Sequence, residues 1–405
     1  MSEEPLPHNS RGRDSSPLHI CIAYDRLYPW SIGGAERWYR RLAQRLASDG
    51  HRVTYLTTRQ WLAGDEPSLP GVRVIAIARD GALYGRGHRR LGPVLRFGLA
   101  LWLHLLRYGH RYDAVHASAM SSWAAFAAGS LTGVRRYTLI LDWWEIWTWA
   151  YWRGYVGPVA GTLGWLMQRQ AARLRHQPIV HSELHARRLR GLHNNALAVR
   201  AHGLLPVTSS VDVPRPADPL ILYAGRFIPE KQVPAIVAAL AQARKRLPLL
   251  RACLIGAGPD TDVVRQAIHI AGLGESVELP GFVSEDALTQ TLKRALCLVL
   301  LSRREGYGLV IVEAAAVGVP SVVLRHPDSA AAELIVEGVN GLTCASTDPD
   351  DVASAILRVY DAGYELRRAT LAWFQANAAT LTMDDSLPHL LDAYRGLSGR
   401  GVASA

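Results

Sequence analysis

The sequence is poor in lysine and in cysteine. Its 405 residues contain three lysines, Lys231, Lys245 and Lys293, against 42 arginines, and only four cysteines. No two cysteines stand at the spacing of a zinc-binding motif, and three of them lie in apolar runs that resemble strands. We therefore expect buried thiols in a reducing compartment, which excludes a disulfide scaffold and a cysteine-based metal site.

Long apolar segments are also missing. No stretch of about 18 uncharged apolar residues occurs, so no single helix is expected to cross a membrane. Residues 1–16 are polar and lack the apolar segment of a secretory signal, and we expect them to form a disordered tail. These features predict a cytoplasmic protein.

The formal net charge of +10 is unevenly placed along the chain. Residues 1–205 carry 27 arginines against 13 acids, whereas residues 206–405 carry 18 basic residues against 22 acids. A basic half favours an acidic partner such as nucleic acid, an anionic membrane or a phosphorylated substrate. A well-solvated arginine-rich surface explains the same charge. No recognition helix, aromatic RNA-binding signature or zinc finger accompanies it, so a nucleic-acid binder stays an alternative supported by charge alone, and we expect no nucleic-acid partner.

Strand-like and helix-like segments alternate through both halves of the chain. The first half begins with the strand "HICIAY" (19–24) and an amphipathic helix that ends at Gly50, and the second half begins with "PLILYAGR" (219–226). This alternation predicts an α/β fold with two Rossmann-like domains that face each other across a cleft, with ligands at the carboxyl ends of the strands. We place the domains at 17–204 and 220–382, the linker at 205–219, and a last helix at 383–398 that packs back on the first domain.

One candidate anion site follows the first strand of the second half. In "AGRFIPEK" (224–231), Gly225 permits a tight turn, Arg226 leaves the carboxyl end of the strand, and Lys231 follows five residues later. A guanidinium and an ammonium that converge on a cleft suit a diphosphate. Taken alone, the same residues are also common on ordinary protein surfaces.

Two carboxylates flank the start of a helix in "SRREGYGLVIVEAAAVGVP" (302–320). The backbone N–H groups at the start of that helix favour an anion. Glu305 precedes the helix and can accept hydrogen bonds from sugar hydroxyls, whereas Glu313 lies inside it and can accept from the vicinal hydroxyls of a ribose. The alternative is structural: Glu305 interacts with the helix dipole and Glu313 forms an ion pair.

These motifs together resemble the retaining glycosyltransferases of family 4, which have the GT-B fold. The resemblance rests on Gly225, Arg226, Lys231 and the pair Glu305 and Glu313, and on three further segments, namely "LPGFVSEDAL" (279–288), "GGAE" (33–36) and "EGVNGL" (337–342). It covers residues 17–400 and is stronger in the second half. The resemblance implies an enzyme that transfers a sugar from a nucleotide-diphosphate donor to a sugar, lipid or small-molecule acceptor.

The resemblance also implies a role for individual residues. Arg226 and Lys231 would bind the diphosphate and stabilise the departing charge, and Glu305 would hold the donor sugar. The ribose would fall to Glu313, and the first-domain loop would close on the phosphates through Gly33 and Gly34. Backbone contacts to the sugar and the base would come from Gly306, Tyr307, Gly308, Leu309, Phe282 and Val283.

The family requires no metal, and the sequence supplies no carboxylate pair at a strand end to hold one. We therefore expect no metal and no cofactor apart from the nucleotide-sugar co-substrate. The positive side chains and a helix end would take the place of a cation. A retaining transfer would then proceed on one face of the sugar, and the leaving phosphate would receive the acceptor proton.

The first half departs from the family pattern in two places. Many relatives carry a histidine after the strand matched here by "YTLILDWWEIW" (137–147), whereas this chain has Asp142 and Glu145. The hinge segment "RAHGLL" (200–205) carries His202 instead of an asparagine. Asp142, Glu145 and His202 are the candidate acceptor contacts. The departures leave open a non-catalytic homologue that binds a nucleotide sugar or assists a partner enzyme.

Aromatic and basic residues gather in two segments of the first half. Residues 143–165 contain half of the chain's 12 tryptophans, and the helix expected within 88–111 is basic. Such segments favour peripheral contact with an anionic membrane at its inner face. The alternative is that both are core helices of the first domain.

Overall fold

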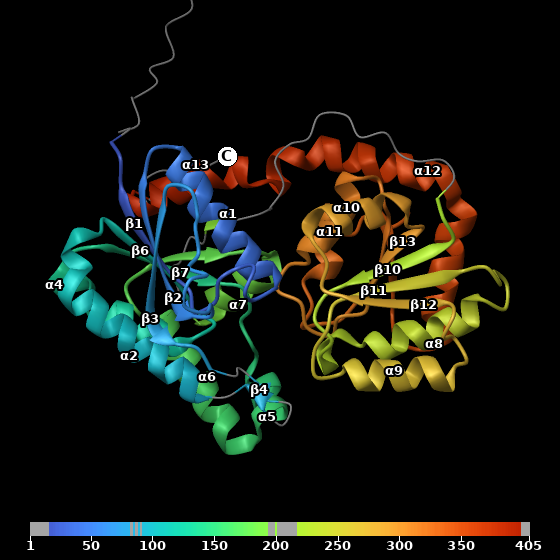
Figure 1. Ribbon diagram of the computed structural model, residues 1–405, viewed down its shortest axis with the longest axis horizontal. Coiled ribbons are helices and arrows are strands. Elements are labelled where there is room, and N and C mark those ends of the chain that lie inside the picture. Colours follow the sequence, from blue (N-terminus) through green and yellow to red (C-terminus); the bar gives the residue numbers. More distant parts are fainter. Residues whose placement is uncertain are drawn as a thin grey trace, which may run out of the picture.

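The computed structural model describes residues 16–81, 91–192 and 217–397, together with the backbone of residues 84–85, 88–89 and 199–200. It has two lobes, each built on a twisted sheet with helices on both faces (Figure 1). We call the lobe of the earlier sheet the first domain and the other the second domain. His202 and most of the predicted linker at 205–219 lie outside the described residues.

The sheet of the first domain is parallel throughout, in the order β3-β2-β1-β6-β7-β8-β9. The strand order reverses between β1 and β6, which makes the carboxyl ends of these strands the natural place for a ligand. Its strands are β1 (His19–Ala23), β2 (Arg52–Arg59), β3 (Val72–Arg79), β6 (Ala114–Ser118), β7 (Thr138–Trp143), β8 (Gln177–Val180) and β9 (Val199–Arg200).

Helices cover both faces of this sheet, as expected for parallel strands that are joined by helical crossovers. A short antiparallel pair, β4 (Tyr84–Gly85) and β5 (His88–Arg89), lies apart from it. The helices are α1 (Gly34–Ser48), α2 (Leu91–Tyr108), the 3₁₀ turn η1 (Gly109–Arg111), α3 (Ser122–Gly129), α4 (Thr132–Arg135), α5 (Trp149–Val156), α6 (Pro158–Ala172) and α7 (Glu183–Leu192).

The sheet of the second domain repeats the same plan, with parallel strands in the order β12-β11-β10-β13-β14-β15. Here the order reverses between β10 and β13. The strands are β10 (Leu220–Ala224), β11 (Arg251–Ile255), β12 (Val277–Gly281), β13 (Cys297–Leu300), β14 (Ser321–Leu324) and β15 (Gly341–Cys344). The helices are η2 (Pro229–Lys231), α8 (Val233–Ala243), α9 (Thr261–Ile270), α10 (Glu285–Arg294), α11 (Leu309–Ala316) and η3 (Ala331–Leu334).

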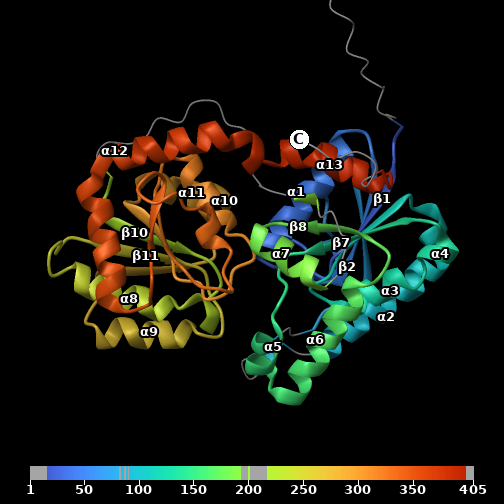
Figure 2. The same ribbon diagram turned by 180° about the vertical axis from the view of Figure 1, so that it is seen from behind.

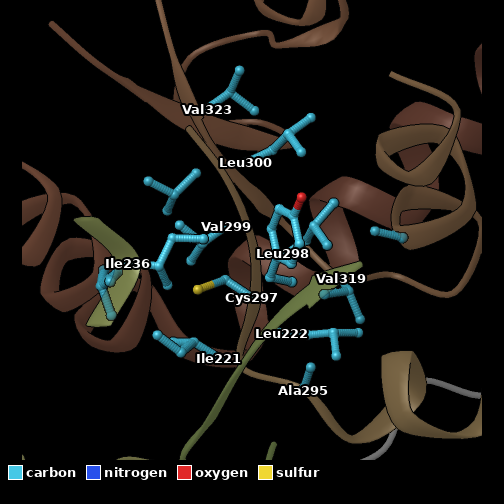
Figure 3. Close-up of a cluster of buried hydrophobic side chains, with 14 of the residues drawn as sticks. Ile221, Leu222, Ile236, Ala295, Cys297, Leu298, Val299, Leu300, Val319 and Val323 are labelled. Carbon is cyan, nitrogen blue, oxygen red and sulfur yellow. The ribbon is translucent and has the colours of Figure 1, made fainter. Parts of the chain in front are cut away.

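The core of the second domain explains why its strands are short apolar runs. Every residue of β13 is buried, because helices cover both faces of the strand. Side chains from β10, β13, β14 and α8 fill this core: Ile221, Leu222, Ile236, Cys297, Leu298, Val299, Leu300 and Val323 (Figure 3). All four cysteines are buried and free, as the sequence predicted.

The C-terminal helices tie the two domains together. Helix α12 (Pro349–Leu381) bends at Gly363, whose φ of 57° is outside the helical range, and its second part crosses from the second domain towards the first (Figures 1 and 2). Helix α13 (Met383–Tyr394) follows, and Leu390 and Tyr394 lie in a core cluster of the first domain. The α/β fold with two Rossmann-like domains is therefore confirmed.

Candidate active site

A cavity of about 290 Å³ lies between the domains, and both sheets contribute to it. Its walls come from segments at or just after the carboxyl ends of strands in each sheet, where doubly wound folds place their ligands. The first domain supplies Tyr24, Asp25, Gly33, Gly34, Arg37, Ser118, Trp144 and Glu145, and the second supplies Gly225, Arg226, Lys231, Phe282, Val283, Arg304, Glu305, Gly306, Tyr307, Gly308, Leu309 and Glu313, among others.

Lys231 and Glu305 meet inside this cavity. The Lys231 Nζ lies 2.5 Å from Glu305 Oε2, and the two side chains are 15% and 19% exposed. Lys231 ends the turn η2 and Glu305 follows strand β13, so the contact joins the two segments that the sequence singled out. Arg226, just after β10, lines the same cavity. The cavity therefore holds two cationic side chains, one of them in contact with the Glu305 carboxylate.

Glu313 pairs with the other domain. Its Oε1 accepts a hydrogen bond from the Arg37 guanidinium of α1, and Arg37 Nε lies 3.3 Å from Glu285 Oε1 of α10. Among the described residues Glu313 Oε2 has no hydrogen-bond partner, although it is buried. Glu313 therefore forms the ion pair of the structural alternative, and the second oxygen of this cavity residue is buried without a donor from the described part of the chain.

The start of helix α11 faces the first domain at very short range. Gly308 precedes the helix with a φ of 103°, a conformation that favours glycine, and supplies no side-chain cap. A Cβ atom on Gly306 would lie 2.5 Å from the Trp144 carbonyl oxygen, and one on Gly34 would lie 2.9 Å from Leu309 Cδ1. Glycine at 34 and 306 thus lets the two domains approach each other beside the first N–H groups of α11.

Arg304 occupies an aromatic cage built mainly by the first domain. Its guanidinium carbon lies 4.5 Å from the Trp147 ring and 5.3 and 5.4 Å from the rings of Tyr151 and Tyr155. Its nitrogens lie 3.0 Å from Glu145 Oε2 and 3.2 Å from Glu230 Oε1. We call these five partners the Arg304 cage. A desolvated guanidinium over aromatic faces is favourable, so the cage fixes the residue next to Glu305.

The Arg304 cage also explains the charge state of Glu145. Burial would raise the pKa of this carboxyl, but Arg304 and the Trp147 indole, whose N–H donates to Glu145 Oε2 at 2.8 Å, hold it below its ordinary value. Burial likewise opposes the charge on Arg304, but Glu145 and its neighbours keep the pKa of Arg304 above its ordinary value. The pair therefore stays ionised at neutral pH.

Asp142 lies behind the cavity wall and does not line the cavity. It is fully buried, its Oδ1 lies 2.7 Å from His181 Nε2, and its Oδ2 accepts a hydrogen bond of 2.8 Å from the Tyr39 hydroxyl. The Trp144 ring, which does line the cavity, stacks on His181 at 3.6 Å. A direct acceptor contact through Asp142 does not fit this position, because its carboxylate is enclosed and already partnered. Its neighbours support Trp144 instead.

Apart from Asp142 and His202, the predicted site residues line the cavity. The cavity brings the predicted phosphate, sugar, ribose and base contacts to one place, and Glu145 joins them from the first domain. His202 lies outside the described residues. Sequence reasoning missed Arg37 and Arg304. Arg37 directly follows "GGAE" (33–36) and Arg304 directly precedes Glu305, so closeness to a motif was the available signal.

The described residues contain neither a metal-binding cluster nor a membrane-spanning helix. No group of three or more histidine, cysteine, aspartate or glutamate side chains there could hold a metal ion. No helix there is long and apolar enough to cross a membrane.

Comparison with known proteins adds the family. The model described as "Glycosyltransferase Family 4" matches residues 32–203, and the model described as "Glycosyl transferases group 1" matches residues 210–370. The glycogen synthase of Mycobacterium tuberculosis is 26% identical over 372 residues, which cover 85% of this chain and 86% of that protein. The alpha-D-kanosaminyltransferase of Streptomyces kanamyceticus is 29% identical over 143 residues, 35% of this chain and 36% of that protein.

Solved structures agree on the fold. The sucrose-phosphate synthase of Thermosynechococcus elongatus matches with a TM-score of 0.76 and 18% identity, over 95% of this chain and 100% of that one. The Anabaena protein HepE, solved in complex with UDP and glucose, matches with a TM-score of 0.69 and 17% identity, over 94% of this chain and 100% of that one. The two family models, which together cover most of residues 32–370, show that the chain belongs to the family 4 glycosyltransferases, and the solved structures show that it has the GT-B fold.

Proposed function

We propose that this glycosyltransferase takes its sugar from a nucleotide-diphosphate donor and transfers it with retention, without a metal ion. The nucleotide part of the donor is supported by the position of Glu313. Its Oε2 is buried at the cavity and has no hydrogen-bond partner among the described residues, while Arg37 holds Oε1. A buried carboxylate oxygen without a donor is costly, and a ribose hydroxyl would supply that donor.

The diphosphate would lie between Arg226, Lys231 and the start of α11. These groups reach one cavity from β10, η2 and the turn after β13. Positive side chains and a helix N-terminus can stabilise the charge that develops on a departing diphosphate. Lys231 would then exchange its contact with Glu305 for a phosphate oxygen, or share it. Phe282, which is 43% exposed at the cavity, and the backbone of Val283 would contact the base.

Glu305 would hold the sugar that is transferred. Its carboxylate lies beside Lys231, which would bind the phosphate next to the reacting carbon. Sugar hydroxyls would donate to Glu305, and the backbone of Gly306 to Leu309 would complete the contacts. This arrangement keeps the sugar carbon in line for transfer.

In the proposed reaction the bond between the sugar carbon and the diphosphate oxygen breaks. A bond to the acceptor oxygen forms on the same face of the sugar, and the acceptor proton passes to the departing phosphate. No protein nucleophile is needed. The acceptor would be a sugar, a lipid or a small molecule, and it would enter along the first-domain wall that contains Ser118, Trp144 and Glu145.

A thermal-shift screen against UDP-, GDP- and ADP-sugars tests the proposal, because a ligand raises the melting temperature according to its occupancy. We expect at least one nucleotide sugar to stabilise the protein and its free sugar to have no effect. If all three nucleotide classes leave the melting temperature unchanged at millimolar concentration, the donor assignment is wrong.

A second candidate is a homologue that binds a nucleotide sugar without transferring it. It is favoured by the first-domain acids, because Asp142 is enclosed and Glu145 is paired with Arg304. Donor binding without product formation or donor hydrolysis would support it. A position in the cytoplasm, at the inner face of a membrane, stays part of the proposal.

A further inference from the structure

The outer side of helix α2 carries a row of exposed leucines. Leu91, Leu95, Leu99 and Leu103 recur every four residues, and each side chain is between 41% and 70% exposed. Positions four apart share one side of a helix, so the four side chains form a continuous strip, here called the leucine row. Single exposed leucines are common, but a contiguous apolar strip marks an interaction surface. The helix fills the core with a different set: Val94, Phe97, Leu101 and Leu105.

Positive charge continues the leucine row. The next positions at the same spacing are Arg107 and Arg111, both exposed, and both guanidinium groups lie over the Tyr108 ring at 5.4 and 5.1 Å. Helix α2 contains no acidic residue. Residues 81–182 as a whole carry 12 arginines against three acids, Asp113, Asp142 and Glu145. Asp142 is fully buried, and Glu145 faces Arg304, so neither offsets this charge at the surface.

Helices α5 and α6 extend the same kind of surface. Helix α3 packs against both α2 and α6, and α5 packs against α6, so the four helices follow one another along this side of the first domain (Figures 1 and 2). Neither α5 nor α6 contains an acidic residue, and α6 exposes Val159, Leu163 and Leu166. Two tryptophans carry an arginine over the ring, Arg153 over Trp149 at 4.3 Å and Arg169 over Trp165 at 5.4 Å. Arginine and tryptophan together are typical of the boundary between lipid head groups and acyl chains.

We propose that α2, α5 and α6 dock the protein on the surface of an anionic lipid bilayer. The leucine row would enter the acyl boundary while the arginines meet the lipid phosphates. The inference gives a surface to the membrane position proposed above and rests on that part of the proposed function. A symmetric contact between two copies of the chain is disfavoured, because it would bring two arginine-rich faces together.

Docking on this face would hold the candidate active site close to the lipid. Phe97 of α2 and Ala124 of α3 line the cavity, whereas the leucine row lies on the opposite side of α2. The wall of the cavity would thus lie about one helix diameter, ~10 Å, from the bilayer. An acceptor head group anchored in that bilayer would have a short path to the cavity.

Vesicle flotation tests the surface. The full chain is mixed with vesicles of phosphatidylcholine alone, or with roughly one third phosphatidylglycerol, at low and high salt. We expect the wild-type protein to float with the anionic vesicles at low salt, and the double variant Leu99→Glu/Leu103→Glu to lose at least ~10-fold in apparent affinity, because charged side chains cannot enter the acyl boundary. The control variant is Leu249→Glu, which changes a leucine that is 79% exposed in the second domain and should still float.

Three results would overturn the inference. Wild-type protein that ignores anionic vesicles at low salt is the first, and a double variant that floats as well as Leu249→Glu is the second. The third is a wild-type dimer by light scattering that the double substitution converts to monomer without any vesicle binding. Melting temperatures of the variants check folding. Calorimetric binding of a nucleoside diphosphate is measured in parallel, so that loss of vesicle binding alone removes only the docking surface and leaves the donor proposal standing.

Discussion

The two domains have the same strand order but differ in what they bring to the cavity. Each sheet reverses its order next to its first strand, between β1 and β6 or between β10 and β13. The second domain supplies Arg226, Lys231 and Glu305, which form the charged centre of the cavity. The first domain adds the Trp144 ring and the charged side chains of Arg37 and Glu145, and its outer face carries the exposed leucines. A shared topology therefore fixes where a site can form, and the loops after the strands decide its chemistry.

Some of the extra arginines of the first domain form ion pairs with carboxylates of the second domain. Arg37 and Arg188 of the first domain reach carboxylates of the second, where Arg188 lies 2.6 Å from Asp328. Glu333 of the second domain accepts hydrogen bonds of 2.9 and 2.7 Å from backbone N–H groups at the start of α7. Opposite charges across the cleft favour closure of the domains. The arginine excess of the first half thus has one role inside the molecule and, as proposed above, another at its surface.

Among the substitutions considered, loss of Lys231 in the second domain should reduce the transfer rate most. Replacing Lys231 by methionine removes an ammonium beside the departing diphosphate, and we expect the transfer rate to fall by ~10²-fold or more. The melting temperature should change little, because the side chain faces the cavity. Lys245→Met is the control, since Lys245 is exposed on the same domain. Turnover of Lys231→Met near the wild-type rate would remove the diphosphate assignment.

Loss of Arg304, which mainly residues of the first domain surround, should lower the transfer rate by a smaller factor. In Arg304→Gln the Arg304 cage loses its cation, so the turn that carries Glu305 is held less firmly against α5. We expect kcat to fall about 10-fold, while affinity for the free nucleoside diphosphate stays unchanged. The neighbouring variant Arg303→Gln is the control, because Arg303 is exposed. Equal losses in both variants would mean that the cage does not position Glu305.

Acid should destabilise the fold of the first domain at a higher pH than that of the second domain. Burial lowers the pKa of His185 and of His104 from 6.5 to about 4, and both lie in the first domain. The unfolded chain therefore takes up these protons first, so their contribution to stability is present above pH 6.5 and is lost as the pH falls towards 4. Hydrogen exchange at pH 7 and pH 5 should show first-domain peptides losing protection, with the second domain as internal reference. Earlier opening of the second domain would contradict this.

A chelator should leave the transfer rate almost unchanged. Two cationic side chains and the start of α11 already face the proposed diphosphate site, and the described residues offer no metal-binding cluster. We therefore expect the transfer rate in excess EDTA to match the rate in buffer. The assay compares EDTA-treated enzyme with enzyme supplied with magnesium or manganese. Activity that disappears with EDTA and returns with a divalent ion would mean that the charged groups of the second domain do not replace a metal.

Much of this arrangement was predictable because short patterns carry it. The alternation of buried strands and helices predicts both domains. The motifs that contain Arg226, Lys231, Glu305 and Glu313 predict four residues that line the cavity. Each pattern lies within a short segment of the sequence. Because the carboxyl ends of parallel strands lie at one edge of the sheet, motifs that follow neighbouring strands lie close together in the fold.

Contacts between the domains were not predictable in the same way. Arg37 meets Glu313 across 276 residues of sequence, and Arg304 meets Tyr151 across 153, so no local pattern links the partners. Asp142 looked like an acceptor contact because it stands near the position where many relatives carry a histidine, but its carboxylate turns into the core, where His181 and Tyr39 pair with it. Side-chain direction at a strand end depends on packing, which the sequence pattern does not report.

The two second-domain carboxylates, Glu305 and Glu313, should hold different parts of one donor. These roles can be tested by calorimetric titration of the free nucleoside diphosphate that belongs to the most stabilising nucleotide sugar. This ligand has the ribose but lacks the transferred sugar. We expect Glu313→Gln to weaken its binding by about 1–3 kcal/mol, because the substitution removes a charged hydrogen-bond acceptor from the ribose. Glu305→Gln should bind it with wild-type affinity and lose kcat instead. If Glu305→Gln loses affinity for the nucleoside diphosphate and Glu313→Gln keeps it, the roles assigned to the two carboxylates are wrong.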